Sequence, residues 1–215
     1  MISLHIPDRS PLRVLCLGAH PDDIEIGCGG TILRLIQERL SLSVHWVVFA
    51  AGGRRGEEAL ASAGLFLERV GDKRIVLNSF DDGFLPYSGR AVKESFEDLK
   101  LEVSPDVIFT HCRQDLHQDH RLISDLTWNT FRDHLILEYE IPKYDGDLGA
   151  PNLFFPLDEA ICERKVRHIW DSYVSQREKP WFTEETLLAL LRLRGIESRS
   201  VGRYAEAFYC RKLVV

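Results

Sequence analysis

The sequence feature that most constrains the fold of this chain is a short polar run between an apolar segment and an amphipathic one. The run, residues 18–30, contains His20, Asp22 and Asp23 around a proline. The apolar residues 14–17 that precede it predict a buried strand, and the pattern that follows it predicts a helix. Turns from strand to helix face the ligand crevice of α/β folds, and proline restricts the neighbouring backbone. We therefore expect an imidazole and two carboxylates together at such a crevice.

A second polar segment follows a later predicted strand, residues 106–110, and contains His111, His117, Asp119 and His120. Two imidazoles and a carboxylate form a common catalytic zinc shell that leaves one position open for water. Three residues of the two segments are expected to bind a metal ion and the others to move protons. The candidates for these tasks are His20, Asp22, Asp23, His117, Asp119 and His120.

Short apolar runs alternate with longer amphipathic segments along the chain, which is typical of β-α-β units. The predicted strands are residues 12–17, 44–49, 74–77, 106–110, 135–140 and 207–214. The predicted helices are residues 31–39, 57–70, 91–101, 119–133, 158–174 and 184–194.

This alternation predicts an α/β fold, Rossmann-like, with a mostly parallel sheet in the order 3-2-1-4-5 and helices on both faces. In that order the first and fourth strands are neighbours, so both polar segments face one crevice. We expect a single domain over residues 1–215. Residues 141–156 have no period and predict a loop, and residues 141–215 are expected to shape the substrate pocket.

Three glycines of the first segment, Gly27, Gly29 and Gly30, also suggest a dinucleotide-binding turn. Their spacing differs from G-x-G-x-x-G, and the two nearby aspartates would repel a phosphate. Close packing of a helix on a strand explains these glycines better.

Composition excludes several classes of protein. The net charge is −6, from 27 basic and 33 acidic residues, and no basic run is dense, which argues against nucleic acid or an anionic membrane surface as partner. Five cysteines without framework spacing indicate reduced thiols. Residues 1–13 lack the apolar core of a signal peptide, and the longest apolar run, residues 46–51, is too short for a membrane span. We expect a cytoplasmic protein, either monomeric or oligomeric.

The motifs themselves resemble a known family. Ala-His-Pro-Asp-Asp at residues 19–23 and His-x-Asp-His at residues 117–120 look like the LmbE/PIG-L family of zinc-dependent N-deacetylases, and residues 204–208 are similar to its closing motif. Members remove acetyl groups from N-acetylglucosamine-type amino sugars. The resemblance covers nearly the whole chain and implies a small amino-sugar substrate, with Zn²⁺ or another divalent cation such as Fe²⁺ as cofactor. The zinc ligands that it implies are His20, Asp23 and His120.

The resemblance also implies roles for the remaining candidates. Asp22 becomes the general base, and His117 becomes the oxyanion stabiliser and general acid, oriented by Asp119. Asp82 is similar to a family aspartate near the sugar, and Glu206 belongs to the closing motif as a substrate contact.

An arginine and a glutamate three positions apart resemble a family pair at the substrate mouth. Arg55 with Glu58 matches this pair, and Arg54 with Glu57 has the same spacing, so both registers stay open.

Three other functions use the same residues. An amidase could cleave a larger amide at this site. A two-histidine, one-carboxylate iron(II) oxygenase shares the ligand set, although the additional base Asp22 and the β-α alternation argue against it. A metal-binding module without chemistry would tolerate replacement of Asp22 and His117.

Overall fold

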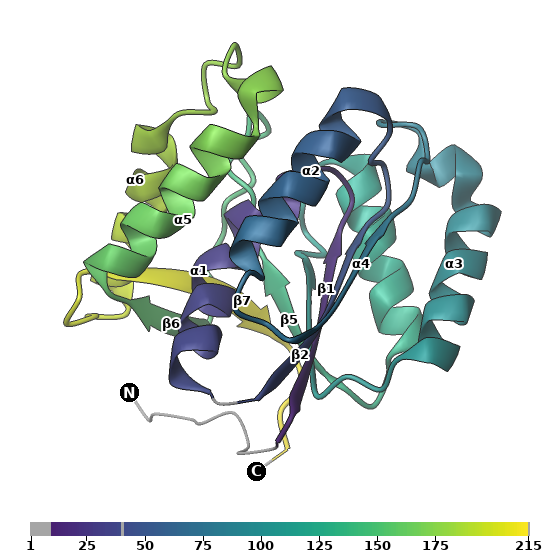
Figure 1. Cartoon of the computed structure of the whole chain (residues 1–215), viewed down its shortest axis with the longest axis horizontal. Coiled ribbons are helices and arrows are strands. Elements are labelled where there is room, and N and C mark those ends of the chain that lie inside the picture. Colours follow the sequence, from purple (N-terminus) through teal and green to yellow (C-terminus); the bar gives the residue numbers. More distant parts are fainter. Residues whose placement is uncertain (1–9, 40, 215) are drawn as a thin grey trace.

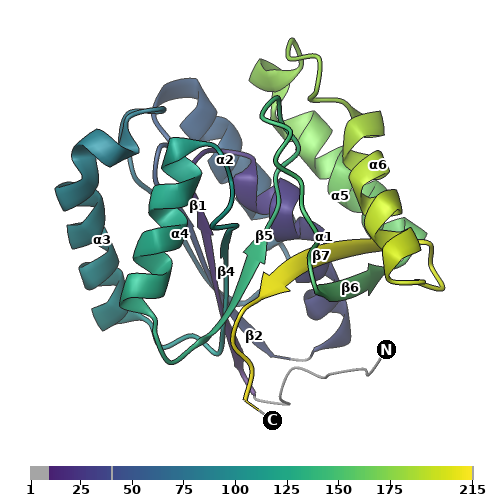
Figure 2. The same cartoon turned by 180° about the vertical axis from the view of Figure 1, so that it is seen from behind.

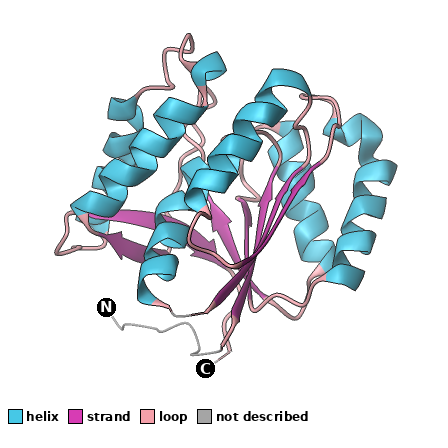
Figure 3. Ribbon diagram, viewed as in Figure 1, coloured by secondary structure: helices cyan, strands magenta, loops and turns pink. Residues whose placement is uncertain are grey.

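The computed structural model describes residues 10–39 and 41–214. In this part of the chain seven strands form one sheet in the order β3-β2-β1-β4-β5-β7-β6, covered by helices on both faces (Figure 1, Figure 3). The strands are β1 Leu12–Gly18, β2 Leu42–Val48, β3 Asp72–Leu77, β4 Val107–His111, β5 Leu135–Tyr139, β6 Leu153–Leu157 and β7 Tyr204–Cys210. The α-helices are α1 Asp23–Glu38, α2 Gly53–Phe66, α3 Gly89–Glu102, α4 Gln118–Thr130, α5 Glu159–Ser172 and α6 Glu184–Glu197, and the 3₁₀ turns are η1 Leu85–Ser88 and η2 Val174–Gln176.

The predicted order 3-2-1-4-5 is confirmed for the five parallel strands β1 to β5. Two further strands extend the sheet, because β7 pairs antiparallel with β5 and β6 pairs antiparallel with β7. The strand expected at residues 207–214 runs instead from Tyr204 to Cys210, and the end of the expected loop 141–156 belongs to β6. β6 is the edge strand of the sheet. An edge strand tolerates Pro156, which has no N–H to donate to a neighbouring strand.

The helices divide between the two faces of the sheet (Figure 1, Figure 2). Alternate residues of β1 supply the two cores: Val14 and Cys16 pack with residues of α1, α2, α5 and α6, whereas Leu15 and Leu17 pack with residues of α3 and α4. A strand that is buried on both faces reads as a continuous apolar run, and residues 14–17 are such a run. Among the described residues, no helix has the length and apolar character that crossing a membrane requires.

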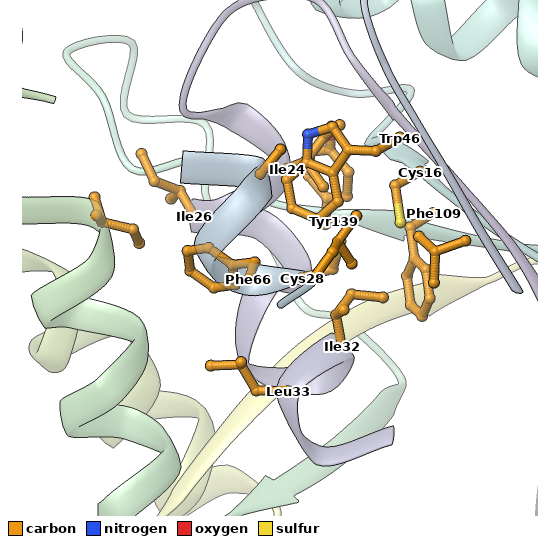
Figure 4. Packing of buried hydrophobic residues seen from close by; sticks show 14 of the residues in the cluster. Cys16, Ile24, Ile26, Cys28, Ile32, Leu33, Trp46, Phe66, Phe109 and Tyr139 are labelled. Carbon is orange, nitrogen blue, oxygen red and sulfur yellow. The ribbon is translucent and has the colours of Figure 1, made fainter. Parts of the chain in front are cut away.

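Helix α1 begins at Asp23, earlier than the predicted start at residue 31, so the glycine-rich segment is helical. A Cβ atom on Gly27 would lie 2.3 Å from Cδ2 of Tyr139, and one on Gly29 would lie 2.6 Å from Cε1 of Phe66. The glycines therefore let α1 approach the sheet and α2 closely. Figure 4 shows Tyr139 and Phe66 packed beside Ile24 and Cys28 of α1. Tertiary packing here outweighs the low helix propensity of glycine, and the predicted close packing of helix on strand is confirmed.

Replacing Gly27 with alanine should lower the free energy of unfolding by about 1–3 kcal/mol, because the added methyl group overlaps Tyr139. Gly64 of α2 has open space around its Cα, so Gly64→Ala should raise that free energy by about 0.5–1 kcal/mol. Urea denaturation of the two variants measures both changes. A Gly27→Ala protein as stable as the wild type would contradict the packing argument.

Candidate metal centre

Two loops at the same edge of the sheet bring the predicted residues together. β1 and β4 are parallel neighbours, so the loop after Gly18 and the loop after His111 leave the sheet side by side. The first loop enters α1 at Asp23, and the second enters α4 at Gln118. The chain thereby joins residues that are far apart in sequence, as the strand order predicts.

The three residues predicted as ligands lie close together. Nδ1 of His20 lies 3.1 Å from Nε2 of His120; Oδ2 of Asp23 lies 3.4 Å from the first nitrogen, and Oδ1 of Asp23 lies 3.6 Å from the second. Donor atoms around a tetrahedral ion with bonds of about 2.1 Å are separated by roughly 3.4 Å. All three side chains are buried. The donor set and its spacing fit a divalent cation.

The far nitrogen of each histidine faces a carboxylate. Nε2 of His20 lies 3.0 Å from Asp119 and 3.2 Å from Asp82, and Nδ1 of His120 lies 2.9 Å from Asp115. An ionised carboxylate only accepts hydrogen bonds, so these nitrogens carry the protons. Nδ1 of His20 and Nε2 of His120 are then unprotonated, and their lone pairs face each other and Asp23. Metal-binding histidines usually donate their other ring N–H to a carboxylate in this way.

Other groups of donors overlap this one. Among the described residues, the donor atoms of His20, His117 and His120 lie within 4.8 Å of one another, and so do those of Asp23, His111 and His120. Nε2 of His111 accepts a hydrogen bond from the backbone N–H of Ala19 at 3.0 Å, and its ring stacks on His120. His111 therefore holds the backbone of the first loop and packs against the ring of His120.

The position of Asp119 corrects one expectation. Its carboxylate does not hold the His117 ring but accepts from the backbone N–H groups of Gly83 and Leu85, at 2.8 and 3.2 Å, and contacts His20. The backbone N–H of Asp119 donates to Nδ1 of His117 at 3.2 Å, because His117 caps α4. This bond leaves the ring proton on Nε2, and burial lowers the pKa of His117. His117 is therefore a neutral donor.

Asp22 lies beside the donor set with an unusual backbone. Its φ angle is 93°, in the left-handed region that residues other than glycine rarely adopt. Burial, together with the charge of Asp23, raises the pKa of Asp22 to about 8. Strain and a displaced pKa on one residue are typical of functional sites.

Arg55, rather than Arg54, points to the site. Its guanidinium donates to Asp82 at 2.6 Å and to the carbonyl of Pro21 at 3.0 Å. Arg54 is exposed and lies 3.6 Å from Glu58, which also accepts from Ser175. Arg55 thus binds Asp82, from the loop before η1, and Glu58 binds Ser175, while the role of Arg55 at the substrate mouth stays a prediction.

Glu206 lies away from the donor set, in contrast to the expected substrate contact. One oxygen accepts from the backbone N–H of Gly30 and from Lys165, both at 2.7 Å, and the other accepts from Thr31 at 2.6 Å. The side chain is buried. Both oxygens are thus used inside the protein, against α1 and α5.

Known proteins share these motifs. A sequence model of PIG-L, described as GlcNAc-PI de-N-acetylase, matches residues 15–131, which contain both loops. The chain belongs to the PIG-L family. YaiS of Escherichia coli, which carries the name uncharacterized deacetylase, is 30% identical over 140 residues, or 60% of this chain and 74% of that protein.

Further relatives show the breadth of the PIG-L fold. The diacetylchitobiose deacetylase of Thermococcus kodakarensis is 30% identical over 135 residues, or 54% of this chain and 47% of that protein. The N,N'-diacetylchitobiose deacetylase from Pyrococcus horikoshii gives a TM-score of 0.70 at 24% identity, over 92% of this chain and 82% of that one. GalB, the 4-carboxy-2-hydroxymuconate hydratase of Pseudomonas putida, gives 0.73 at 18% identity, over 94% and 97%. The fold thus occurs in proteins named for two different reactions.

Asp115 is the site residue of this PIG-L protein that sequence reasoning missed. It is buried, and its second oxygen accepts from the backbone N–H of His117 at 2.8 Å. Its place five residues before His120 was a usable sign, because a metal-binding histidine needs an acceptor for its other ring proton. Cys112 lies in the same loop, and burial raises the pKa of its thiol to about 11, which disfavours the thiolate form.

The backbone at residue 22 yields a stability prediction. The free energy of unfolding of Asp22→Gly should exceed that of Asp22→Ala by about 1 kcal/mol, because glycine adopts a positive φ without strain. Urea denaturation of the two variants compares them without reference to the lost carboxylate. An alanine variant as stable as the glycine variant would contradict the strain.

Metal binding yields a second prediction. Adding Zn²⁺ to metal-stripped protein should raise Tm, since an ion that binds only the folded state stabilises it. His120→Ala should abolish the increase, whereas His134→Ala, a change outside the donor groups, should keep it. Differential scanning calorimetry measures Tm in each case. The same increase in wild type and His120→Ala would remove His120 from the ligand set.

Proposed function

We propose that this protein is a metal-dependent hydrolase that removes the N-acetyl group from an amino sugar or its conjugate. The observation that carries the proposal is a set of two imidazoles and one carboxylate, with a second carboxylate, Asp22, and a neutral imidazole, His117, beside it. The names of the PIG-L family and of its deacetylase relatives support the choice of an N-acetyl substrate.

His20, Asp23 and His120 would hold the ion, and Zn²⁺ is the cation that we propose. Two imidazoles and one carboxylate are a known catalytic zinc set with a place left for water. A cation of this kind would lower the pKa of a water molecule and would polarise a carbonyl group as a Lewis acid. Hydrolysis uses both properties.

Asp22 would act on protons. Its carboxylate takes a proton from the attacking water, and the pKa of about 8 reflects how readily the buried group holds it. The C–N bond of the amide then breaks, and the proton passes from Asp22 to the leaving nitrogen. The products are acetate and a free amine, and the reaction balances with one water consumed.

His117 would stabilise the carbonyl oxygen as it gains negative charge. The ring nitrogen Nδ1 already accepts from the backbone of Asp119, so Nε2–H is the donor that remains. This arrangement favours oxyanion stabilisation over the acid role that we also expected for His117, because protonation of Nδ1 would break the cap of α4.

Arg55 and Asp82 would bind the sugar. Their ion pair borders the donor set, and the Asp82 side chain remains half exposed, so it can accept from a hydroxyl group. Residues 141–215 would shape the rest of the pocket. Glu206 has no part in our proposal, since both of its oxygens bind backbone and lysine groups.

Replacement of Asp22 by asparagine tests the mechanism. Asparagine keeps the size of the side chain and tolerates positive φ, so the fold should persist while kcat falls by about 10²- to 10⁴-fold. Acetate release from diacetylchitobiose and other N-acetylglucosamine conjugates, read with a coupled assay, gives kcat. The exposed Asp81→Asn is the matched control and should keep full activity.

Two outcomes would overturn the proposed function. One is the absence of acetate release by metal-loaded wild type across the panel of N-acetylated sugars. The other is an unchanged rate in Asp22→Asn. Release of a larger acid would instead indicate an amidase with the same site, and oxygen uptake with Fe²⁺ would indicate the oxygenase.

A further inference from the structure

The loop between β5 and β6 carries a lysine that reaches the metal centre from outside the PIG-L match. Nζ of Lys143 donates to Asp115 at 3.0 Å and to Asp147 at 2.5 Å. The lysine side chain is only 9% exposed, although it comes from a loop. An ammonium group is rarely buried unless it is paired.

The lysine and a proposed ligand share one oxygen atom. Oδ2 of Asp115 receives Nζ of Lys143 at 3.0 Å and Nδ1 of His120 at 2.9 Å. The other oxygen accepts from the backbone N–H of His117 at 2.8 Å. One buried carboxylate thus connects the loop to both histidines of the second motif.

The loop is held at its other end as well. Oδ2 of Asp147 accepts from the backbone N–H of Leu116 at 2.8 Å, which closes a second link to the same motif. Nearer to β6, Gly149 donates to Glu140 at 2.9 Å and accepts from Arg194 of α6 at 3.0 Å. The conformation of the loop therefore depends on contacts with the metal centre on one side and with α6 on the other.

Charge explains why the lysine matters. A histidine that binds a cation through Nε2 is neutral, so its Nδ1–H alone does not offset the charge of Asp115, whose side chain is 2% exposed. The ammonium of Lys143 supplies positive charge to this carboxylate and to that of Asp147. Without it, the carboxylate would move toward water and release the ring of His120.

We propose that Lys143 is a positioning residue of the metal centre: it holds Asp115 against His120 and thereby ties the order of the loop to metal binding. The inference rests on the proposed metal-dependent function. Coupling of this kind is reciprocal, so the ion should also stabilise the loop in the conformation in which Lys143 binds Asp115.

Metal affinity is the first test. Competition with a chromophoric chelator gives the Kd for Zn²⁺ of wild type, Lys143→Met, Lys143→Arg and the control Lys100→Met, an exposed lysine of α3. Lys143→Met should weaken binding by about 10- to 100-fold, as loss of outer support usually does. Lys143→Arg should restore most of the affinity, and Lys100→Met should match the wild type.

A double-mutant cycle separates positioning from general destabilisation. In an Asp115→Asn background, Lys143→Met should have no further effect on Kd, because the lysine acts through that carboxylate. The double variant removes both charges of the Asp115–Lys143 pair, and Asp147 keeps its bond from the backbone N–H of Leu116. Comparison with Asp115→Asn therefore answers the question even where Lys143→Met alone fails to fold. A tenfold further loss in that background would overturn the proposed route.

Proteolysis measures whether metal binding stabilises the loop between β5 and β6. Tyr144 is 72% exposed and offers a site for chymotrypsin. Zn²⁺ should slow cleavage after Tyr144 in wild type and in Lys100→Met, but not in Lys143→Met. Equal Kd values and equal protection in wild type and Lys143→Met would overturn the role of Lys143 alone, whereas a wild type that binds no divalent cation would overturn both proposals.

Discussion

The concentration of buried carboxyl groups at one edge of the sheet is the constraint on which the site depends. Asp22 and Asp115 of the two loops and Asp23 and Asp119, in the first turns of the helices that follow, all have buried carboxyl groups. Burial of ionised groups is costly unless they are paired and hydrogen-bonded. Imidazole N–H groups, backbone N–H groups and the cations of Arg55 and Lys143 offset part of this cost. A divalent cation among His20, Asp23 and His120 would offset most of the remainder, so the chemistry of the site and the stability of the loops have a common origin.

The packing of α1 brings this charge to its place. The glycines of α1 lie against Tyr139 and Phe66, and Lys165 and Glu206 reach its backbone from α5 and β7. Ile26 C=O and Gly30 N–H, which a regular helix would join, each bind one of these two side chains. A buried ion pair thus fastens the helix that begins with Asp23. Glu206 contributes to the site at a distance, through the position of α1.

The parts of the chain differ in what they share with relatives. The PIG-L match ends at residue 131, so it includes both motifs and excludes the loop before β6, α5, α6 and β7. A fold that occurs in proteins named deacetylase and hydratase does not determine the reaction. Substrate choice is therefore expected from side chains at the rim, such as Arg55, and from the second half of the chain.

The sequence by itself determined the parallel order of the first five strands and the two loops that meet, because periodicity and motif spacing are local properties. Through the resemblance to a family, it also predicted His20, Asp23 and His120 as metal ligands, and the structure places their side chains close together. Tertiary structure alone decided which carboxylate supports which ring: Asp119 turns to His20, and Asp115 turns to His120. It decided likewise that Arg55 faces Asp82, that the glycine run is helical and that Glu206 lies under α1. These choices depend on contacts between residues far apart in the chain, whose geometry arises only when the helices pack on the sheet.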